Sequence, residues 1–206
     1  MPDEKVDSIS YSHSDHFENR DIQQEFNAWN APSARLQISA VCFLTGILYV
    51  IYSQLDSIAA PAELRPMMTT IHLYIIAPVL FLISLLSFWK NFPTLTLTML
   101  ILAPIGAAIG NLFIVVNIES PATYLTELYL ILFWTFTVSG LQLAQATISA
   151  VGTFIIVSIT TYFLFPLPRE LLIMHFFWML SAFSFGFLGA YLLEESNRRV
   201  FLNHGQ

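Results

Sequence analysis

The sequence predicts an all-α, polytopic membrane protein with six transmembrane helices, and two observations carry this prediction. Of the 206 residues, 56% are hydrophobic and 11% are charged, whereas a soluble domain has about 25% charged residues. The apolar residues also form long unbroken blocks, each with the length that a helix needs to cross a bilayer. The mean hydropathy of +0.66 agrees with this class.

The chain begins with a polar segment, residues 1–34, which we expect to be cytoplasmic. It holds seven of the fourteen acidic residues and lacks the pattern of a cleavable signal peptide. Its last part, "IQQEFNAWNAPSARL", leaves two alternatives open. It is an amphipathic helix with Phe26 and Trp29 on the membrane surface, or it is a plain linker.

The six apolar segments form the predicted transmembrane domain, residues 35–193. Each is about 17–24 residues long, enough to cross about 30 Å of hydrocarbon at 1.5 Å per residue. Turn or charge signals such as "KNFP", "NIESP" and "FPLPRE" separate them. The predicted helices are Leu36–Tyr52, Met68–Trp89, Leu95–Val116, Ala122–Val138, Thr147–Phe165 and Glu170–Leu193.

Six crossings place both termini on the same side of the membrane, and the basic residues indicate the side. With both termini in the cytoplasm, four basic residues near helix ends are cytoplasmic and only Arg65 and Arg169 lie outside. The outer loops are too short to form a domain. An external ligand is therefore expected to bind within the helices or just above them.

Three ionisable side chains lie inside the predicted spans, where such groups are costly and usually functional. His72 in "TTIHLYIIAP", Glu127, and His175 in "LLIMHFFWML" each follow the outer start of a span by about one to two turns. At 1.5 Å per residue, both histidines lie roughly 6–8 Å below the outer boundary. We expect the three side chains to share one layer of the outer leaflet.

Three interpretations of the histidines stay open. In the first, each is an interior residue that hydrogen-bonds to Glu127, to Asn117 or to a backbone carbonyl. Alternatively, His72 and His175 are the axial ligands of one haem b, with Arg65 and Arg169 as partners of its propionates. In the third interpretation, His72, His175 and Glu127 bind Zn or Cu.

Small residues predict where helices pack closely. Ala182, Gly186 and Ala190 recur at every fourth position of the last span, and His175 lies seven residues earlier on roughly the same face. A second row, "GAAIG", begins at Gly106 in the third span. We expect both rows, and His175, to face other helices.

Beyond the last span, residues 194–206 predict the start of a cytoplasmic signalling helix. The stretch "AYLLEESNRRVFLNHGQ" is rich in helix formers and contains no proline. Together with "EFNAWNAPSARLQISAVCFLTGILYVIYSQLD" and the six short-looped spans, this exit resembles the membrane anchors of bacterial class III adenylate cyclases. Diguanylate cyclases and histidine kinases carry similar anchors, and some anchors are cytochrome b-like.

The resemblance implies a homodimer in the bacterial inner membrane, with a C-terminal cyclase domain in the same chain. The family's catalytic aspartates have no counterpart here, so we expect these residues not to be an enzyme. No other catalytic set is visible, and no basic patch predicts nucleic-acid binding.

The expected function is a sensor that passes a signal from the outer-leaflet layer through the last helix to the cyclase. One alternative is a passive, dimerising anchor of a cyclase, a diguanylate cyclase or a histidine kinase. Another is a stand-alone membrane cytochrome or a small transporter.

Overall fold

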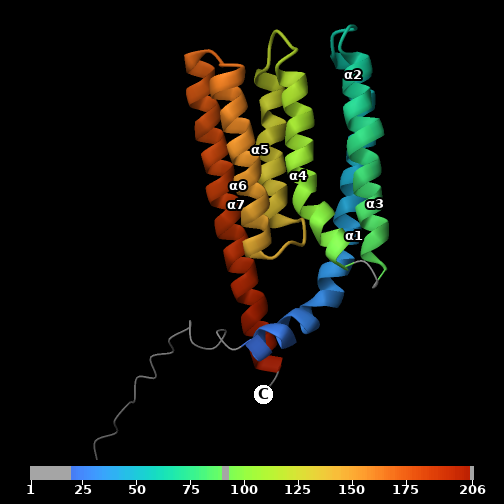
Figure 1. Ribbon diagram of the computed structural model, residues 1–206, viewed down its shortest axis with the longest axis vertical. Helices are drawn as coiled ribbons and strands as arrows, with labels where there is room; N and C mark the ends of the chain where they lie inside the picture. Colours follow the sequence, from blue (N-terminus) through green and yellow to red (C-terminus); the bar gives the residue numbers. More distant parts are fainter. Residues whose placement is uncertain (1–19, 90–92, 205–206) are drawn as a thin grey trace, which may run out of the picture.

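A computed structural model describes residues 20–89 and 93–204, and every regular element in these two ranges is a helix (Figure 1). The predicted all-α class is therefore confirmed for the described residues. The elements are α1 (Arg20–Ala59), α2 (Arg65–Thr69), the π-helix η1 (Thr70–Ile76), α3 (Ala77–Ser87), α4 (Pro93–Val115), α5 (Ala122–Thr137), α6 (Leu143–Ile159), the π-helix η2 (Thr160–Leu164) and α7 (Arg169–His204). Each π-helix directly continues an α-helix.

Several helices of the described chain are long and apolar enough to cross a membrane. They are the stretches Ile22–Ala59, Arg65–Ser87, Pro93–Val115, Leu143–Leu164 and Arg169–Asn203. The remaining helix, α5, has 16 residues and measures about 24 Å at 1.5 Å per residue; it packs against α4, α6 and α7. The chain thus has the architecture of a multi-pass membrane protein, as the sequence predicts. The side on which each terminus lies stays a prediction.

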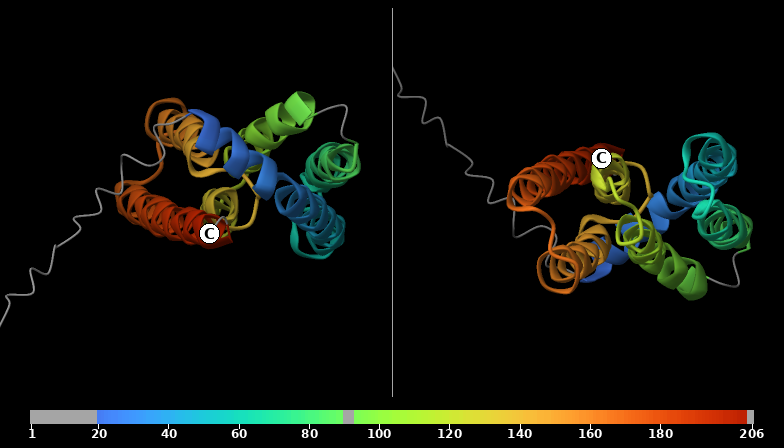
Figure 2. Two further views of the ribbon diagram at one scale, coloured as in Figure 1. Left: turned by 90° about the horizontal axis from the view of Figure 1, so that it is seen from below. Right: turned by 90° about the horizontal axis from the view of Figure 1, so that it is seen from above.

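The helices run alternately up and down between two ends of the bundle. We name as upper the end that carries α2 and the loop before α5, and as lower the end where α7 stops (Figure 1). The closest packing joins α1 to α3, α4 to α6, and α5 to α7. Seen along the bundle, α2, α3 and the upper part of α1 lie on one side and α6 and α7 on the other, with α4 and α5 between (Figure 2).

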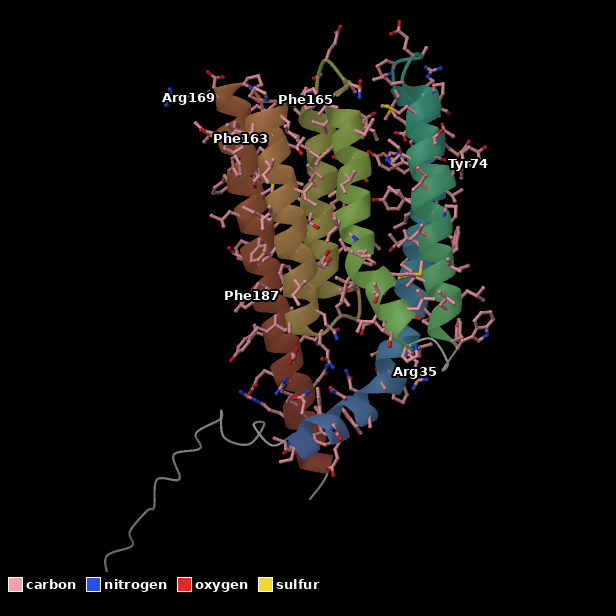
Figure 3. All side chains as sticks on the ribbon, viewed as in Figure 1. Arg35, Tyr74, Phe163, Phe165, Arg169 and Phe187 are labelled. Atoms are coloured by element: carbon pink, nitrogen blue, oxygen red, sulfur yellow. The ribbon has the colours of Figure 1, made fainter. Side chains whose placement is uncertain are left out.

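The first helix is longer than the predicted span and bends. Its lower part runs obliquely beneath the bundle to the end of α7, and Arg35 lies near the bend (Figures 1 and 3). Pro32 lies inside the helix, and an internal proline removes a backbone hydrogen bond and commonly causes a kink. The helical alternative for this segment is therefore confirmed, but Phe26 is buried against α7 instead of lying on a membrane surface.

Large apolar side chains cover the outside of the bundle, as lipid contact requires. Tyr74 is 69% exposed and Phe163 is 73% exposed, and both point away from the neighbouring helices (Figure 3). A water-soluble helix keeps polar residues on its outer face, so this surface suits hydrocarbon.

The two predicted small-residue rows have different outcomes. Gly186 and Ala190 are buried, and a Cβ added at Gly186 would lie 2.8 Å from Cδ2 of Phe136 on α5. That row is therefore a close-packing face, as predicted. In the row that begins at Gly106, Gly110 approaches Ile71, but a Cβ added at Gly106 would meet nothing within 4 Å. The prediction of close packing at Gly106 is wrong, because no neighbouring helix approaches this glycine.

Candidate functional site

Near the upper end, four helical elements bring together a buried polar cluster. We use the name upper polar cluster for Tyr49 and Asp56 of α1, His72 of η1, Asn111 of α4 and Glu127 of α5. Its ionisable members are almost inaccessible: the exposed fraction is 0% for His72, 2% for Asp56 and 9% for Glu127. Ionisable groups at such positions in a membrane protein generally mark a functional site.

His72 is held from two sides. Its Nδ1 lies 2.5 Å from Oδ2 of Asp56, and its ring stacks on Tyr52 with the ring centroids 4.6 Å apart. The other ring nitrogen, Nε2, has no hydrogen-bond partner and lies 3.8 Å from Oε2 of Glu127. The acid therefore fixes the orientation of the imidazole, and the imidazole presents a free nitrogen toward a second acid.

Glu127 accepts one hydrogen bond on each carboxylate oxygen. The Tyr49 hydroxyl donates to Oε1 at 2.8 Å, and Nδ2 of Asn111 donates to Oε2 at 2.7 Å. Nδ2 of Asn111 also donates to the carbonyl of Tyr124, at 3.0 Å, whereas Oδ1 of Asn111 has no partner. Because an ionised carboxylate has about four acceptor positions, Glu127 can accept further donors.

A local change of helix type places His72 in this cluster. The N–H of Ala77 donates to the carbonyl of His72, five residues earlier, which is the π-helical bond. In an α-helix, Pro78 could not donate to the carbonyl of Tyr74, and its ring would clash with that carbonyl. The wider π turns just before Pro78 accommodate the proline, and such segments are frequent at functional sites.

His175 occupies a separate buried position between α7 and α5. Its exposed fraction is 0%, its Nδ1 lies 2.9 Å from the Tyr129 hydroxyl, and its Nε2 has no hydrogen-bond partner. The prediction that His175 faces another helix is confirmed. Glu127 and Tyr129 are two residues apart on α5 and so project about 200° apart around that helix. The two histidines consequently lie on different sides of α5.

The observed contacts of His72 and His175 can be compared with the three interpretations of these histidines. Both are buried and hydrogen-bonded, but their partners are Asp56 and Tyr129, not the expected ones. In each, Nδ1 has a partner and Nε2 is free, which is the pattern of a metal-binding histidine. However, α5 separates them, so they do not face a common space. Haem b ligation by His72 and His175 stays a prediction.

The other residues of the haem and metal predictions are placed as follows. Arg65 begins α2 and is exposed. Arg169 begins α7 and is exposed at the upper end (Figure 3). Nε of Arg65 donates to the carbonyl of Ala60 at 3.0 Å. Within residues 20–89 and 93–204, no group of three or more His, Cys, Asp or Glu is arranged to hold a metal ion. Of the proposed Zn or Cu ligands, only His72 and Glu127 are neighbours.

Asp56 is one of the members of the upper polar cluster that the sequence interpretation missed, with Tyr49 and Asn111. It stands in "SQLDSIAAPAELRP", which reads as a loop because of its charge and prolines, but α1 continues to Ala59. One signal was present. Tyr49, Tyr52 and Asp56 follow one another at spacings of three and four, which places them on one face of a helix.

No family model matches this chain. No curated protein and no solved structure matches it either. The function is therefore inferred from the geometry of the chain itself.

A groove of about 910 Å³ adjoins the upper polar cluster. Side chains of α1, η1, α3, α4 and α5 line it, and they include Tyr49, Tyr52 and Glu127 near the upper end and Trp134 near the lower end. Several lining residues, such as Leu48 and Leu130, are more than half exposed. The groove is therefore open to the side, toward the surface that lipid would cover.

At the lower end, a second set of contacts joins the extension of α7 to the rest of the chain. We name it the lower junction, and it comprises Phe26, Trp29, Glu194, Arg198 and Phe201. Oε2 of Glu194 accepts the N–H of Leu143 at the start of α6, at 2.8 Å, and Oε1 accepts a hydrogen bond from Arg198 at 2.7 Å.

Aromatic contacts complete the lower junction. The ring of Phe201 lies 5.6 Å from the rings of both Phe26 and Trp29, measured between centroids. The guanidinium of Arg198 lies 5.5 Å from the ring centroid of Phe26, within the range of a cation–π contact. The lower junction thus links α7 to α6 and to the oblique part of α1.

Proposed function

We propose that this chain is the membrane sensor region of a signalling protein. In this proposal, a binding event or a redox change at the upper polar cluster alters the packing of α5 against α7. The altered position of α7 is then transmitted through the lower junction to a cytoplasmic effector. No chemical reaction is assigned to these residues.

The observation that carries the proposal is the continuity of α7. This helix has 36 residues and measures about 54 Å, well beyond the roughly 30 Å of hydrocarbon that it would cross. It bears His175 near its upper end and Glu194, Arg198 and Phe201 near its lower end. A continuous rigid helix moves as one body, so a displacement at its upper end also displaces its lower end.

The helix α5 supports the connection between the polar cluster and α7. It carries Glu127 on one side and Tyr129, the partner of His175, on the other. Further down, Phe136 of α5 packs against the Gly186 face of α7. A ligand that binds one arrangement of α5 more tightly than another would shift this contact, because only a difference in affinity can shift such an equilibrium.

The identity of the effector is supported by the sequence resemblance alone. We propose a cyclase domain of the class III adenylate cyclase type, following α7 in the same chain, and homodimerisation in the bacterial inner membrane. A passive anchor is the competing function, and it differs in one respect. It requires no change of output when the upper polar cluster changes.

A fusion of the full chain to a reporter cyclase tests the sensor function. Cyclic AMP output is measured in vesicles under oxidising and reducing conditions and with added lipophilic compounds. We expect at least one condition to change the output, and Glu127→Gln to abolish that change. Glu63→Gln, an exposed acid in the α1–α2 loop, is the matched control and should respond as the parent does.

The proposal is rejected if the output is constant under all conditions in a correctly inserted fusion. It is also rejected if Glu127→Gln responds as strongly as the parent. Either result favours the passive anchor.

A further inference from the structure

We propose that the groove beside the upper polar cluster binds an elongated amphipathic cation, namely an aliphatic chain that ends in an ammonium group. The inference rests on the proposed sensor function, because it names the ligand class of that same site. The ammonium group would lie at Glu127, and the chain would extend toward Trp134.

The shape of the groove suits an extended ligand. Its volume of about 910 Å³ falls within the roughly 300–1,000 Å³ that is typical of small-molecule sites. Along α5 its lining runs from Thr123 to Val138, about 22 Å at 1.5 Å per residue. This exceeds the thickness of one leaflet, which is about half of 30 Å. A chain of lipid length can therefore lie in it.

The wall of the groove is apolar along most of this length. It is built chiefly from aliphatic side chains, including Leu48, Ile76, Leu80, Met99, Leu102 and Leu130. Gly106 lies in this wall and leaves open space where a larger residue would project. Such a wall attracts a hydrocarbon chain, because burial removes apolar surface from water.

The acidic side chain at the upper end of the groove favours a ligand with a positive charge. Among the described residues that line the groove, Glu127 is the one acid, and none is a lysine, arginine or histidine. The acid Asp56 lies behind it, beyond His72, so the cluster combines two carboxyl groups with one imidazole. A buried carboxylate needs a partner of opposite charge, and an ammonium supplies one.

The hydrogen-bond acceptors and the aromatic rings at the upper end of the groove both suit an ammonium group. Such a group has three N–H donors, while Glu127 lines the groove and retains acceptor capacity beyond its two hydrogen bonds. Tyr49 and Tyr52 also line this part of the groove, and the faces of aromatic rings attract cations. A fatty acid would instead bring a like charge to Glu127.

Photolabelling of the full chain in phosphatidylcholine nanodiscs tests the inference. The probe is dodecylamine with a diazirine near the end of its chain, and mass spectrometry locates the labelled peptides. We expect labelling on the groove faces of α4 and α5, including the neighbourhood of Trp134. Unlabelled dodecylamine should compete at concentrations about tenfold lower than dodecanol or lauric acid, since hydrogen bonds to a charged group are the stronger kind.

Two variants separate groove binding from partition into lipid. Gly106→Leu should fill the groove and abolish the competed labelling, while Gly189→Leu is the matched control. A Cβ at Gly189 meets only Thr137 Cγ2, at 3.9 Å, and Gly189 does not line the groove. Glu127→Gln should remove most of the preference for the amine while the labelled position stays the same.

The outcomes distinguish the ligand class, its source and the sensor function. Even labelling of all lipid-facing helices, or equal competition by lauric acid, overturns the inference. Loss of labelling in nanodiscs that contain phosphatidylethanolamine identifies an aminophospholipid as the source of the ammonium, and retained labelling identifies a free amine. Specific labelling without any effect of dodecylamine on the cyclase fusion would reject the sensor function and leave the ligand class standing.

Discussion

His72 and Asp56 form a buried acid–imidazole pair across two helices, with 2.5 Å between Nδ1 and Oδ2. The imidazole is fully buried and the acid is 2% exposed. Since Asp56 belongs to α1 and His72 to η1, the pair joins the two arms of the first helical hairpin at its upper end.

Loss of Asp56 should destabilise the protein. Asp56→Ala leaves Nδ1 of the buried His72 imidazole without its hydrogen-bond partner, and an unsatisfied buried polar group costs about 1–3 kcal/mol. Thermal unfolding of the purified protein in detergent measures the loss. Glu63→Ala is the matched control, because Glu63 is exposed and should change stability by less than about 0.5 kcal/mol. Equal melting temperatures for the two variants would contradict the buried pair.

Tyr129→Phe tests the second histidine. The substitution removes the hydroxyl 2.9 Å from Nδ1 of His175 and should cost about 1–3 kcal/mol, the usual penalty for an unsatisfied buried polar group. The same change at Tyr74, which is 69% exposed, should have little effect. Thermal unfolding again provides the measurement, and a neutral Tyr129→Phe would mean that the hydrogen bond is not formed.

Gly186→Ala should loosen the contact between α5 and α7. The new Cβ would lie 2.8 Å from Cδ2 of Phe136, whose ring is itself packed against Phe183 and Phe187. Overpacking of this kind costs about 1–3 kcal/mol, which should exceed the roughly 1 kcal/mol gained in helix propensity.

The matched control for Gly186→Ala is Gly189→Ala. Its new Cβ would be 3.9 Å from Cγ2 of Thr137, an ordinary contact, so the variant should be neutral or slightly more stable. If both alanine variants melt above the parent, the close packing of Gly186 against α5 is refuted.

Glu194→Gln should weaken the lower junction without unfolding the bundle. Oε2 of Glu194 accepts the backbone N–H of Leu143, one of the N–H groups at the start of α6 that lack a partner within their helix. A neutral amide is a weaker acceptor, so amide exchange of Leu143 should become several-fold faster. Hydrogen–deuterium exchange with peptide-level mass spectrometry detects this change.

Glu195→Gln provides the control for the lower junction. Glu195 pairs with Arg199 one turn along the same helix, and Arg199 is largely exposed. Exchange at the start of α6 should stay at the parent rate in this variant. Unchanged exchange in Glu194→Gln as well would show that the contact between α7 and α6 is not maintained in solution.

The haem prediction has a direct spectroscopic test. If His72 and His175 ligate haem b, the chain expressed with ample haem shows a Soret band and sharp α and β bands on reduction. Both features should be lost in His72→Ala and in His175→Ala. A colourless preparation rules out haem, and metal analysis of the same sample decides on Zn or Cu.

The sequence predicts the helices of this protein better than it predicts their contacts. The apolar segments were recognisable because crossing hydrocarbon demands a minimum run of apolar residues. The partner of His175 was not recognisable in the sequence. Its identity depends on how α5 is rotated about its axis, and Tyr129 is one of many aromatic residues in the chain. Gly106 illustrates the same limit, since a glycine that permits close packing and one that faces open space look alike in a sequence.

The π-helical segment η1 determines which way His72 points. A π turn holds about one residue more than an α turn, and one residue in a helix corresponds to about 100° of rotation. The part of the helix above η1 is therefore turned relative to the direction that α3 alone would give it. If Thr70–Ile76 wound as an α-helix with no residue deleted, the segment above would turn by about 100°, and the imidazole would leave Asp56 and face another side. The acid–imidazole pair is thus a product of backbone winding as much as of side-chain identity.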